Sequence, residues 1–384
     1  SLKTITLPAA LETIEQRAFK GSGLTSIVMP KGITKLLDGT YGSQAETFMN
    51  CKELTSVEFL GAVENIGEKV FANCVKLETV KFAGSENKAD GTIVFPKTLT
   101  KLYDQAFFNT AIKGVVIHDK FTEVGYMYRQ SYSESNKYYD CYGVFANCAQ
   151  LKYVEYNAKT ITGGVEAFRN CTALETVKFG SSAIDLCSSG TNKTLLMGYM
   201  FAGCTSLRKV DLGGVKALSS NMFNNCTALE EITIPKTLAY INSGSFENSG
   251  ITTVNFEEGR TSNIYFTQLS ASGSTSTNVF KNCLNLTSFV FPEKTSFGSK
   301  VAASSTGNIF EGCVNLTSVE FKNDMTVLPE KIFLGCEKLT TIKFNTTPEN
   351  ATGLYIPGGI TVGKNAFDGV GEGATITFET NYYY

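Results

Sequence analysis

The chain has 384 residues, of which 42% are hydrophobic and 18% are charged. This balance is sufficient for a packed core and argues against a disordered chain. The 34 basic and 36 acidic side chains give a net charge of -2. Because no basic excess is present to neutralise phosphates, the composition argues against nucleic-acid binding. Apolar runs such as residues 289–291 are too short to cross a bilayer.

The first residues already read as part of a repeating unit. Residue 1 is Ser rather than Met, and residues 2–5 have the pattern of a strand. We therefore expect that the chain begins inside a repeat and that a targeting segment has been removed.

One pattern, Phe-x-x-Cys-x-x-Leu-x-x-Val-x-Phe, then recurs along the chain. It is complete at residues 48–59, 71–82 and 168–179, and its shortest spacings are 22 and 23 residues, a period in the range of leucine-rich repeats. The residues that define it in these three copies are Phe48, Cys51, Leu54, Val57, Phe71, Cys74, Leu77, Val80, Phe168, Cys171, Leu174 and Val177. Counting weaker copies, the anchoring Phe occurs at positions 19, 48, 71, 107, 145, 168, 201, 223, 246, 280, 310, 333 and 367.

The alternation at Val and Phe predicts a short strand with one buried side in each copy. An aliphatic residue five positions before the anchoring Phe is expected to close the opposite wall of each coil. These residues are Ile14, Ile66, Leu102, Leu196, Leu218, Ile241, Leu328 and Val362. We therefore predict one leucine-rich-repeat solenoid domain over residues 1–384, of the α/β-repeat class. It would have about 13 coils of 22–23 residues, mostly short parallel strands and little helix.

The polar position between Val and Phe alternates in charge between successive copies. In a parallel register, opposite charges would face each other, and each pair would be worth about a few tenths of a kcal/mol. We interpret these charges as a solvated ladder rather than a substrate site. They are Glu58 and Lys81; Glu155, Lys178 and Asp211; and Glu320 and Lys343.

The unit Ala-Phe-x-x-Cys-x-x-Leu-x-x-Val-x-Phe/Ile-Pro resembles the BspA-type leucine-rich repeat of bacterial surface proteins. Residues 166–171 and 229–235 carry parts of it, and the resemblance extends from Leu2 to about Phe378. It implies a secreted or cell-surface protein that attaches to host proteins or to other cells. The chain departs from the regular family pattern in its long insertions.

Variation in length falls after the strand and before the next anchoring Phe. The long stretches are 83–106, 118–144, 180–200, 257–279, 292–309 and 345–366, which are expected to emerge on one side of the solenoid. The second is rich in tyrosine, which is enriched with Arg at recognition surfaces. Its candidate binding patch is Tyr126, Tyr128, Arg129, Tyr132, Tyr138, Tyr139 and Tyr142. The alternative is that these rings only pack the insertion onto the flank.

Nine of the eleven cysteines occupy the same slot of the repeat. In other copies this slot holds Ser22, Thr110, Ser249 or Val370, so we expect buried thiols that fill space rather than react. The nine are Cys51, Cys74, Cys148, Cys171, Cys204, Cys226, Cys283, Cys313 and Cys336. Cys141 and Cys187 lie in insertions, and a disulfide between Cys141 and Cys148 stays open.

The sequence offers little for catalysis. His118 is the only histidine, directly after a strand, and is expected to be an ordinary strand-end residue. There is no Cys-x-x-Cys pair for zinc, and the loop carboxylates Glu86, Asp90, Glu257 and Glu258 form no EF-hand-like loop. We predict no catalytic, cofactor-binding or metal-binding residue.

These observations favour an adhesion module outside the cell that binds a protein or glycan ligand, with neither nucleic-acid binding nor membrane insertion. One alternative is a structural spacer within a surface protein, favoured by the uniform polar columns on the strands. The other is a carbohydrate-active enzyme built on a β-solenoid, which would need acidic residues clustered on adjacent coils.

Overall fold

A computed structural model describes residues 2–380, apart from residues 37–44, 87, 126–142, 160–161, 164, 185, 187–197, 267–276, 297–306, 323–326, 345–360 and 373–376. By its internal contacts the chain divides into two compact units. The N-terminal unit holds residues 1–190 and 195–213, and the C-terminal unit holds residues 191–194 and 214–384. A single domain over residues 1–384 stays a prediction.

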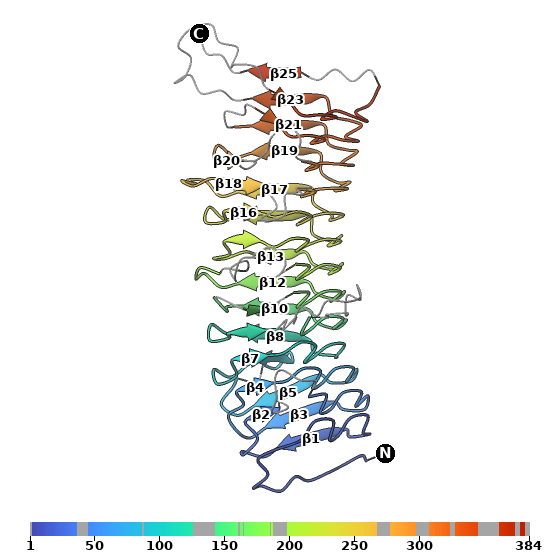
Figure 1. Cartoon of the computed structure of the whole chain (residues 1–384), viewed down its shortest axis with the longest axis vertical. Helices are drawn as coiled ribbons and strands as arrows, with labels where there is room; N and C mark the ends of the chain where they lie inside the picture. The colour runs from blue at the N-terminus through green and yellow to red at the C-terminus, as the bar shows by residue number, and fades with distance from the viewer. Residues whose placement is uncertain are drawn as a thin grey trace, which may run out of the picture. The chain divides into compact units, whose positions relative to one another are not determined.

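Short parallel strands stack coil upon coil in the N-terminal unit (Figure 1). The strands that carry the Val-x-Phe motif, which we call motif strands, form two sheets in the orders β1-β3-β5 and β13-β12-β10-β8-β6. They are β1 (Ser26–Met29), β3 (Ser56–Phe59), β5 (Thr79–Phe82), β8 (Gly114–Ile117), β10 (Tyr153–Tyr156), β12 (Thr176–Phe179) and β13 (Lys209–Asp211), joined by β6 (Thr92–Val94).

A second, narrower sheet forms the opposite wall of this unit, in the order β11-β9-β7-β4-β2. Its two-residue strands are β2 (Lys35–Leu36), β4 (Asn65–Ile66), β7 (Lys101–Leu102), β9 (Glu123–Val124) and β11 (Thr162–Gly163). Ile66 and Leu102 are fully buried and paired in this sheet, as predicted for the aliphatic position five residues before the anchoring Phe.

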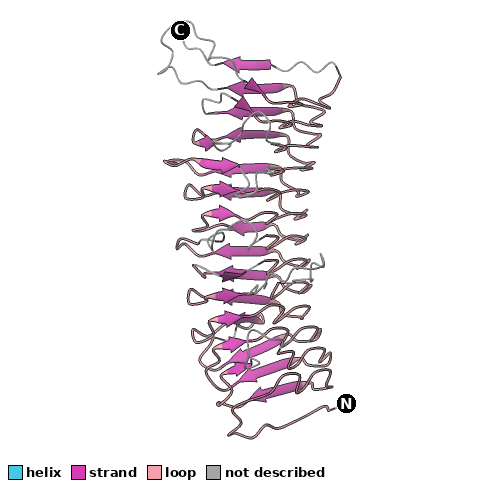
Figure 2. Cartoon of the chain, viewed as in Figure 1, coloured by secondary structure: helices cyan, strands magenta, loops and turns pink. Residues whose placement is uncertain are grey.

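The C-terminal unit repeats this plan. Its motif strands are β15 (Glu231–Ile234), β17 (Thr253–Phe256), β19 (Ser288–Phe291), β21 (Ser318–Phe321), β23 (Thr341–Phe344) and β25 (Thr377–Thr380). Its opposite wall holds β14 (Ala217–Leu218), β16 (Tyr240–Ile241), β18 (Ile264–Phe266), β20 (Thr295–Ser296), β22 (Val327–Leu328) and β24 (Thr361–Val362). Leu218, Ile241 and Leu328 are buried as predicted, whereas Leu196 lies outside the described residues. Strands and turns account for the described chain, which contains no helix (Figure 2).

The anchoring Phe side chains form a column of stacked rings in each unit. Neighbouring ring centroids lie 5.2–5.6 Å apart from Phe19 to Phe201. From Phe223 to Phe367 they lie 5.3–6.0 Å apart. Seven rings in one unit and six in the other confirm the thirteen coils predicted from the sequence. Burial of each ring from Phe48 to Phe333 stabilises its coil by about 1.5–3 kcal/mol.

The tight turn after each anchoring Phe depends on the residue two positions later. That residue is Asn or Gly in all thirteen coils, and its φ lies between 53° and 75°. Only Gly, and to a lesser degree Asn, adopts this left-handed conformation at low cost. Side chains add a ladder in places, since the Asn73 amide donates to Asn50 Oδ1 at 3.1 Å and the Asn109 amide to Asn73 Oδ1 at 2.9 Å.

The nine repeat cysteines are free thiols with no exposed surface, which confirms the expectation of buried side chains. They do more than fill space. The Cys171 thiol donates to the backbone oxygen of Phe145 in the preceding coil at 3.1 Å, and the Cys313 thiol donates to that of Phe280 at 3.0 Å. Thr110, which replaces Cys in its coil, bonds instead to its own Phe107 oxygen at 3.0 Å. Because a hydroxyl can make a similar bond, Ser and Thr are accepted in this slot.

One of the predicted insertions contributes a strand to the sheet and side chains to the core. The stretch 83–106 was expected to emerge on one side of the solenoid, but β6 within it joins the motif-strand sheet beside β8. Ile93 and Phe95 are buried there, so the core takes up part of the stretch. An apolar pair at alternate positions is sufficient for an extra strand, even without an anchoring Phe of its own.

Candidate functional site

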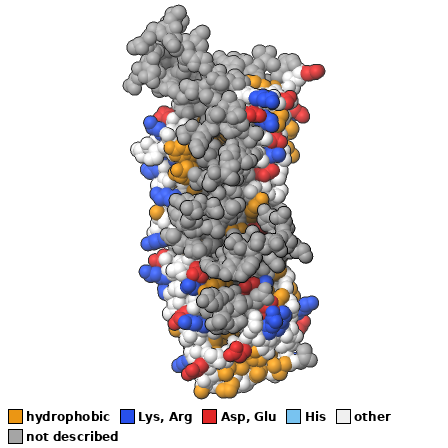
Figure 3. All heavy atoms as spheres, in the orientation of Figure 1, with side chains coloured by type: hydrophobic (Ala, Val, Ile, Leu, Met, Phe, Trp, Pro, Cys, Tyr) orange, Lys and Arg blue, Asp and Glu red, His pale blue; other side chains and the backbone are white. Residues whose placement is uncertain are grey.

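The outer face of the motif strands is a regular polar surface. Along β3 and β5 the side chains of Val57, Phe59, Val80 and Phe82 are buried and their neighbours point outward. On the face drawn in Figure 3, acidic and basic side chains are intermingled among the described residues. Such a surface has no large field of one sign to attract a polyanion or polycation.

The register predicted from alternating charges is confirmed. Glu58 lies opposite Lys81, and the column Glu155, Lys178 and Asp211 runs across β10, β12 and β13. In the C-terminal unit Glu320 lies opposite Lys343. Several ion pairs lie just before the strands, including Lys113 with Glu78 at 2.9 Å and Lys76 with Glu53 at 2.7 Å. These exposed pairs are each worth about 0–1 kcal/mol.

This pattern is interrupted where β6 enters the sheet of the N-terminal unit. β6 pairs with β8 in parallel, so Thr92 lies opposite Gly114 and Val94 opposite Val116. On the other side of β8, Tyr153 lies opposite Gly114. The outward positions of β6 and β8 therefore carry no charged side chain, whereas β10 and β12 carry Glu155 and Lys178 there.

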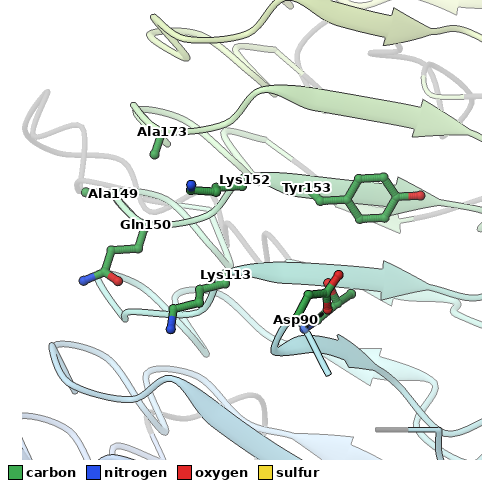
Figure 4. A pocket seen from close by; sticks show the side chains of 8 residues that line it. Asp90, Lys113, Ala149, Gln150, Lys152, Tyr153 and Ala173 are labelled. Carbon is green, nitrogen blue, oxygen red and sulfur yellow. Dashed lines mark hydrogen bonds between the residues drawn. The ribbon is translucent and has the colours of Figure 1, made fainter. Parts of the chain in front are cut away.

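A hollow of about 440 Å³ lies at the start of these strands. Figure 4 shows Tyr153 along β10, Lys113 and Lys152 ahead of β8 and β10, and Asp90 beside β6. Its volume is in the range of small-molecule sites. We call it the β8 hollow, and it is lined by Asp90, Thr92, Lys113, Ala149, Gln150, Lys152, Tyr153 and Ala173.

Gly114 allows β6 to pack closely against β8 beside the hollow. A Cβ at this position would lie 2.4 Å from Thr92 Oγ1 and 3.1 Å from Thr92 Cβ, far inside van der Waals contact. The strand therefore has no side chain between Thr92 on one neighbour and Tyr153 on the other. The Thr92 side chain occupies the space that a side chain on Gly114 would need, and all three strands are hydrogen-bonded into one sheet.

Hydrogen bonds fix the polar groups of the hollow. The Thr92 backbone N–H donates to Asp90 Oδ1 at 2.8 Å, and this bond holds the pKa of Asp90 below its usual value. The Tyr153 hydroxyl donates to Glu155 Oε2 at 2.9 Å, and burial together with this carboxylate raises the pKa of Tyr153 to about 12. Burial raises the pKa of Glu155, but hydrogen bonds from Asn157 and Tyr153 outweigh it and keep the pKa low. At neutral pH the hollow therefore holds a neutral phenol and ionised carboxylates.

His118 has the structural role expected of it. Its Nδ1 accepts from the Lys120 backbone N–H at 3.1 Å, so Nε2 carries the proton and donates to the Pro96 oxygen at 2.7 Å. Its ring packs on Phe121 with centroids 4.5 Å apart. Burial lowers the pKa of His118. With both ring nitrogens bonded to backbone, His118 is not placed to serve as a general base.

The buried thiols are also poorly placed for chemistry. Burial raises the pKa of Cys148 to about 11 and that of Cys204 to about 12. Cys51 differs, because its interactions with Cys74 and Ser22 lower its pKa, yet its side chain has no exposed surface. A thiolate without access to a substrate cannot act as a nucleophile.

The binding patch predicted from the sequence lies outside the described residues. This applies to Tyr126, Tyr128, Arg129, Tyr132, Tyr138, Tyr139 and Tyr142, and to Cys141 of the open Cys141–Cys148 pair. The β8 hollow was not predicted. The available signal was Gly114, a strand glycine in a position that most other copies fill with Ser or Thr.

Within the described ranges, no three His, Cys, Asp or Glu side chains come close enough to hold a metal ion. Nor does any described segment form a helix of the length and hydropathy that crossing a membrane requires.

The stacked coils and the two walls of parallel strands define a leucine-rich-repeat protein. Residues 1–137, 141–270 and 260–382 match the family model of the BspA type leucine rich repeat region. The chain therefore belongs to the BspA-type leucine-rich-repeat family, as the resemblance in its sequence indicated.

Solved structures of leucine-rich repeat proteins are similar to this chain. A leucine-rich repeat protein from Bacteroides ovatus is 20% identical, with a TM-score of 0.51 over 90% of this chain and 72% of its own. One from Eubacterium ventriosum is also 20% identical, with a TM-score of 0.41 over 94% of this chain and 86% of its own. No protein of curated function matches the chain.

Proposed function

We propose that this chain is an extracellular or cell-surface adhesion module that recognises host or bacterial macromolecules without catalysing a reaction. Membership of the BspA-type family, named for repeats of bacterial surface proteins, supports placement outside the cell. The mixed, nearly neutral surface supports binding through local shape and hydrogen bonding rather than through a long-range field.

The observation that carries this proposal is the β8 hollow. A uniform spacer has no need to interrupt its polar ladder, yet beside β6 and β8 the surface holds a depression lined by Tyr153 and two lysines. Concave sites with an aromatic wall and a few fixed polar groups are typical of ligand binding. The Tyr-rich insertion stays a second candidate contact.

Binding of the purified chain to immobilised host matrix proteins and mucin tests the proposal. One variant carries Tyr153→Ala and Lys152→Ala in the hollow. A second variant replaces residues 126–142 by a short Gly/Ser linker, which leaves β9 intact because that strand ends at Val124. Tyr240→Ala, a half-buried strand tyrosine of the C-terminal unit, is the matched control.

We expect saturable binding by the intact chain and by the control, with binding lost in the hollow variant. Loss in the linker variant alone would move the site to the insertion. If the folded chain binds nothing, the structural spacer becomes the better account. New reducing or unsaturated ends in a polysaccharide screen would favour the enzyme alternative instead.

A further inference from the structure

We propose that the β8 hollow binds a neutral oligosaccharide, with Tyr153 as the stacking surface for one sugar ring. This inference rests on the proposed binding function and names its ligand class.

The hollow offers an apolar surface beside polar groups. Tyr153, Thr92, Ala149 and Ala173 line it, and the Thr92 side chain lies close over Gly114. A pyranose has one face of C–H groups and a perimeter of hydroxyls. Such a ring can cover an aromatic surface while its hydroxyls reach polar neighbours.

The two lysines of the hollow already have acidic partners. Lys113 pairs with Glu78 at 2.9 Å, and Lys152 lies 3.9 Å from Glu175. Asp90 accepts from the Thr92 N–H. An ionic ligand would have to compete with these partners, whereas a neutral polyol can add to them. This arrangement favours an uncharged ligand.

Donors and acceptors suit a polyol. Each ammonium group carries three donors, so Lys113 and Lys152 retain donors beyond their present pairs. Asp90 is exposed, and its carboxylate is an acceptor with several lone pairs. Gln150 is exposed and supplies both a donor and an acceptor. Hydroxyl groups, which donate and accept at once, match such a mixed rim better than a single carboxylate or ammonium does.

The backbone around the hollow argues against an extended peptide. Peptides commonly add a strand to an exposed sheet edge, where main-chain groups supply affinity. Here β8 is flanked by β6 and β10, with which it is paired in parallel. A peptide at this place would therefore have only side chains to contact.

Calorimetric titration of the purified chain with cellohexaose, maltohexaose, mannohexaose and neutral mucin O-glycans tests the assignment. We expect saturable binding of at least one of these. Tyr153→Ala should weaken it by about tenfold or more, a stacking effect. Tyr153→Phe should keep binding within about threefold, because the hydroxyl is used by Glu155 rather than by the ligand. Tyr240→Ala is the control and should bind as the unaltered chain does.

The outcomes separate this inference from the proposed function. Protein binding that is lost in Tyr153→Ala, with no sugar bound, would overturn the glycan assignment and leave the binding module in place. Binding of heparin or polygalacturonate but of no neutral sugar would overturn the uncharged ligand. Sugar binding that Tyr153→Ala leaves unchanged would overturn the site. No binding of protein or glycan by the folded chain would count against both.

Discussion

At the scale of single residues, the structure depends on slots that tolerate few side chains. The second Phe of the motif fills one such slot, and in β10 the residue in this slot is Tyr156. Tyr156 is fully buried, packs against Phe179 with ring centroids 5.7 Å apart, and its hydroxyl has no partner among the described residues. A buried hydroxyl without a hydrogen bond loses its solvation and gains nothing in return.

We therefore expect Tyr156→Phe to raise the free energy of unfolding by about 1 kcal/mol. The urea midpoint, measured at an unchanged m-value, checks this. Phe179→Tyr is a useful contrast, since it adds a buried hydroxyl and should lower the midpoint. A lower midpoint in Tyr156→Phe would show that the hydroxyl is hydrogen-bonded after all.

His118 gives the stability a dependence on pH whose sign follows from burial. Its pKa is lowered in the folded chain, whereas in the unfolded chain it lies at about 6.5. Between these two values the unfolded state binds more protons, so stability rises with pH there. The contribution is complete above about pH 6.5 and is lost as pH falls through the unfolded pKa toward the folded one.

The urea midpoint from pH 8 to pH 5.5 measures this effect. His118 is the only histidine, and the variant His118→Gln removes it while keeping every carboxylate. The difference between the two pH profiles of stability therefore reports on His118. We expect the unaltered chain to lose more stability over this range than the variant does. Parallel pH profiles would contradict a buried neutral imidazole.

At the scale of elements, the insertion of β6 beside β8 is the main departure from the regular repeat. The sheet accepts it because Gly114 leaves room for Thr92. Gly114→Ala should lower the stability by about 1–3 kcal/mol, since the new Cβ would meet the Thr92 side chain.

Thr92→Ala in the same chain should restore part of this loss, because it removes the Oγ1 and Cγ2 atoms that the new methyl group would strike. A double-mutant cycle on urea midpoints gives the coupling between the two positions. Independent, additive effects would mean that β6 does not press on β8 as the structure describes.

At the scale of the whole molecule, much of the fold follows from the sequence. The thirteen anchoring Phe positions predicted the number of coils, and the alternating charges at Glu58 and Lys81 predicted the parallel register. These are consequences of a strict repeat, in which each coil packs only on its neighbours.

The β8 hollow was not predicted, because it arises where the repeat is broken. Residues 92–94 show only a short apolar alternation without an anchoring Phe, and nothing in that segment indicates which strand it joins. Its neighbour β8 lies more than twenty residues further along the chain, so tertiary packing rather than local sequence determines this pairing. Gly114 marked the place, but a strand glycine alone does not distinguish a bulge from a close approach.

The most direct test of the β8 hollow as the binding site is to block it with a label on an introduced cysteine. The starting chain carries Cys141→Ser and Cys187→Ser, so that only the nine repeat cysteines remain, and these have no exposed surface. When Gln150→Cys is added, polyethylene glycol maleimide should therefore label position 150. Binding to the matrix-protein, mucin and neutral-glycan panel should be blocked by this label at the rim of the β8 hollow. It should survive the same label on Lys236→Cys, an exposed position of the C-terminal unit. Binding unaffected by the label at position 150 would contradict the β8 hollow as the site.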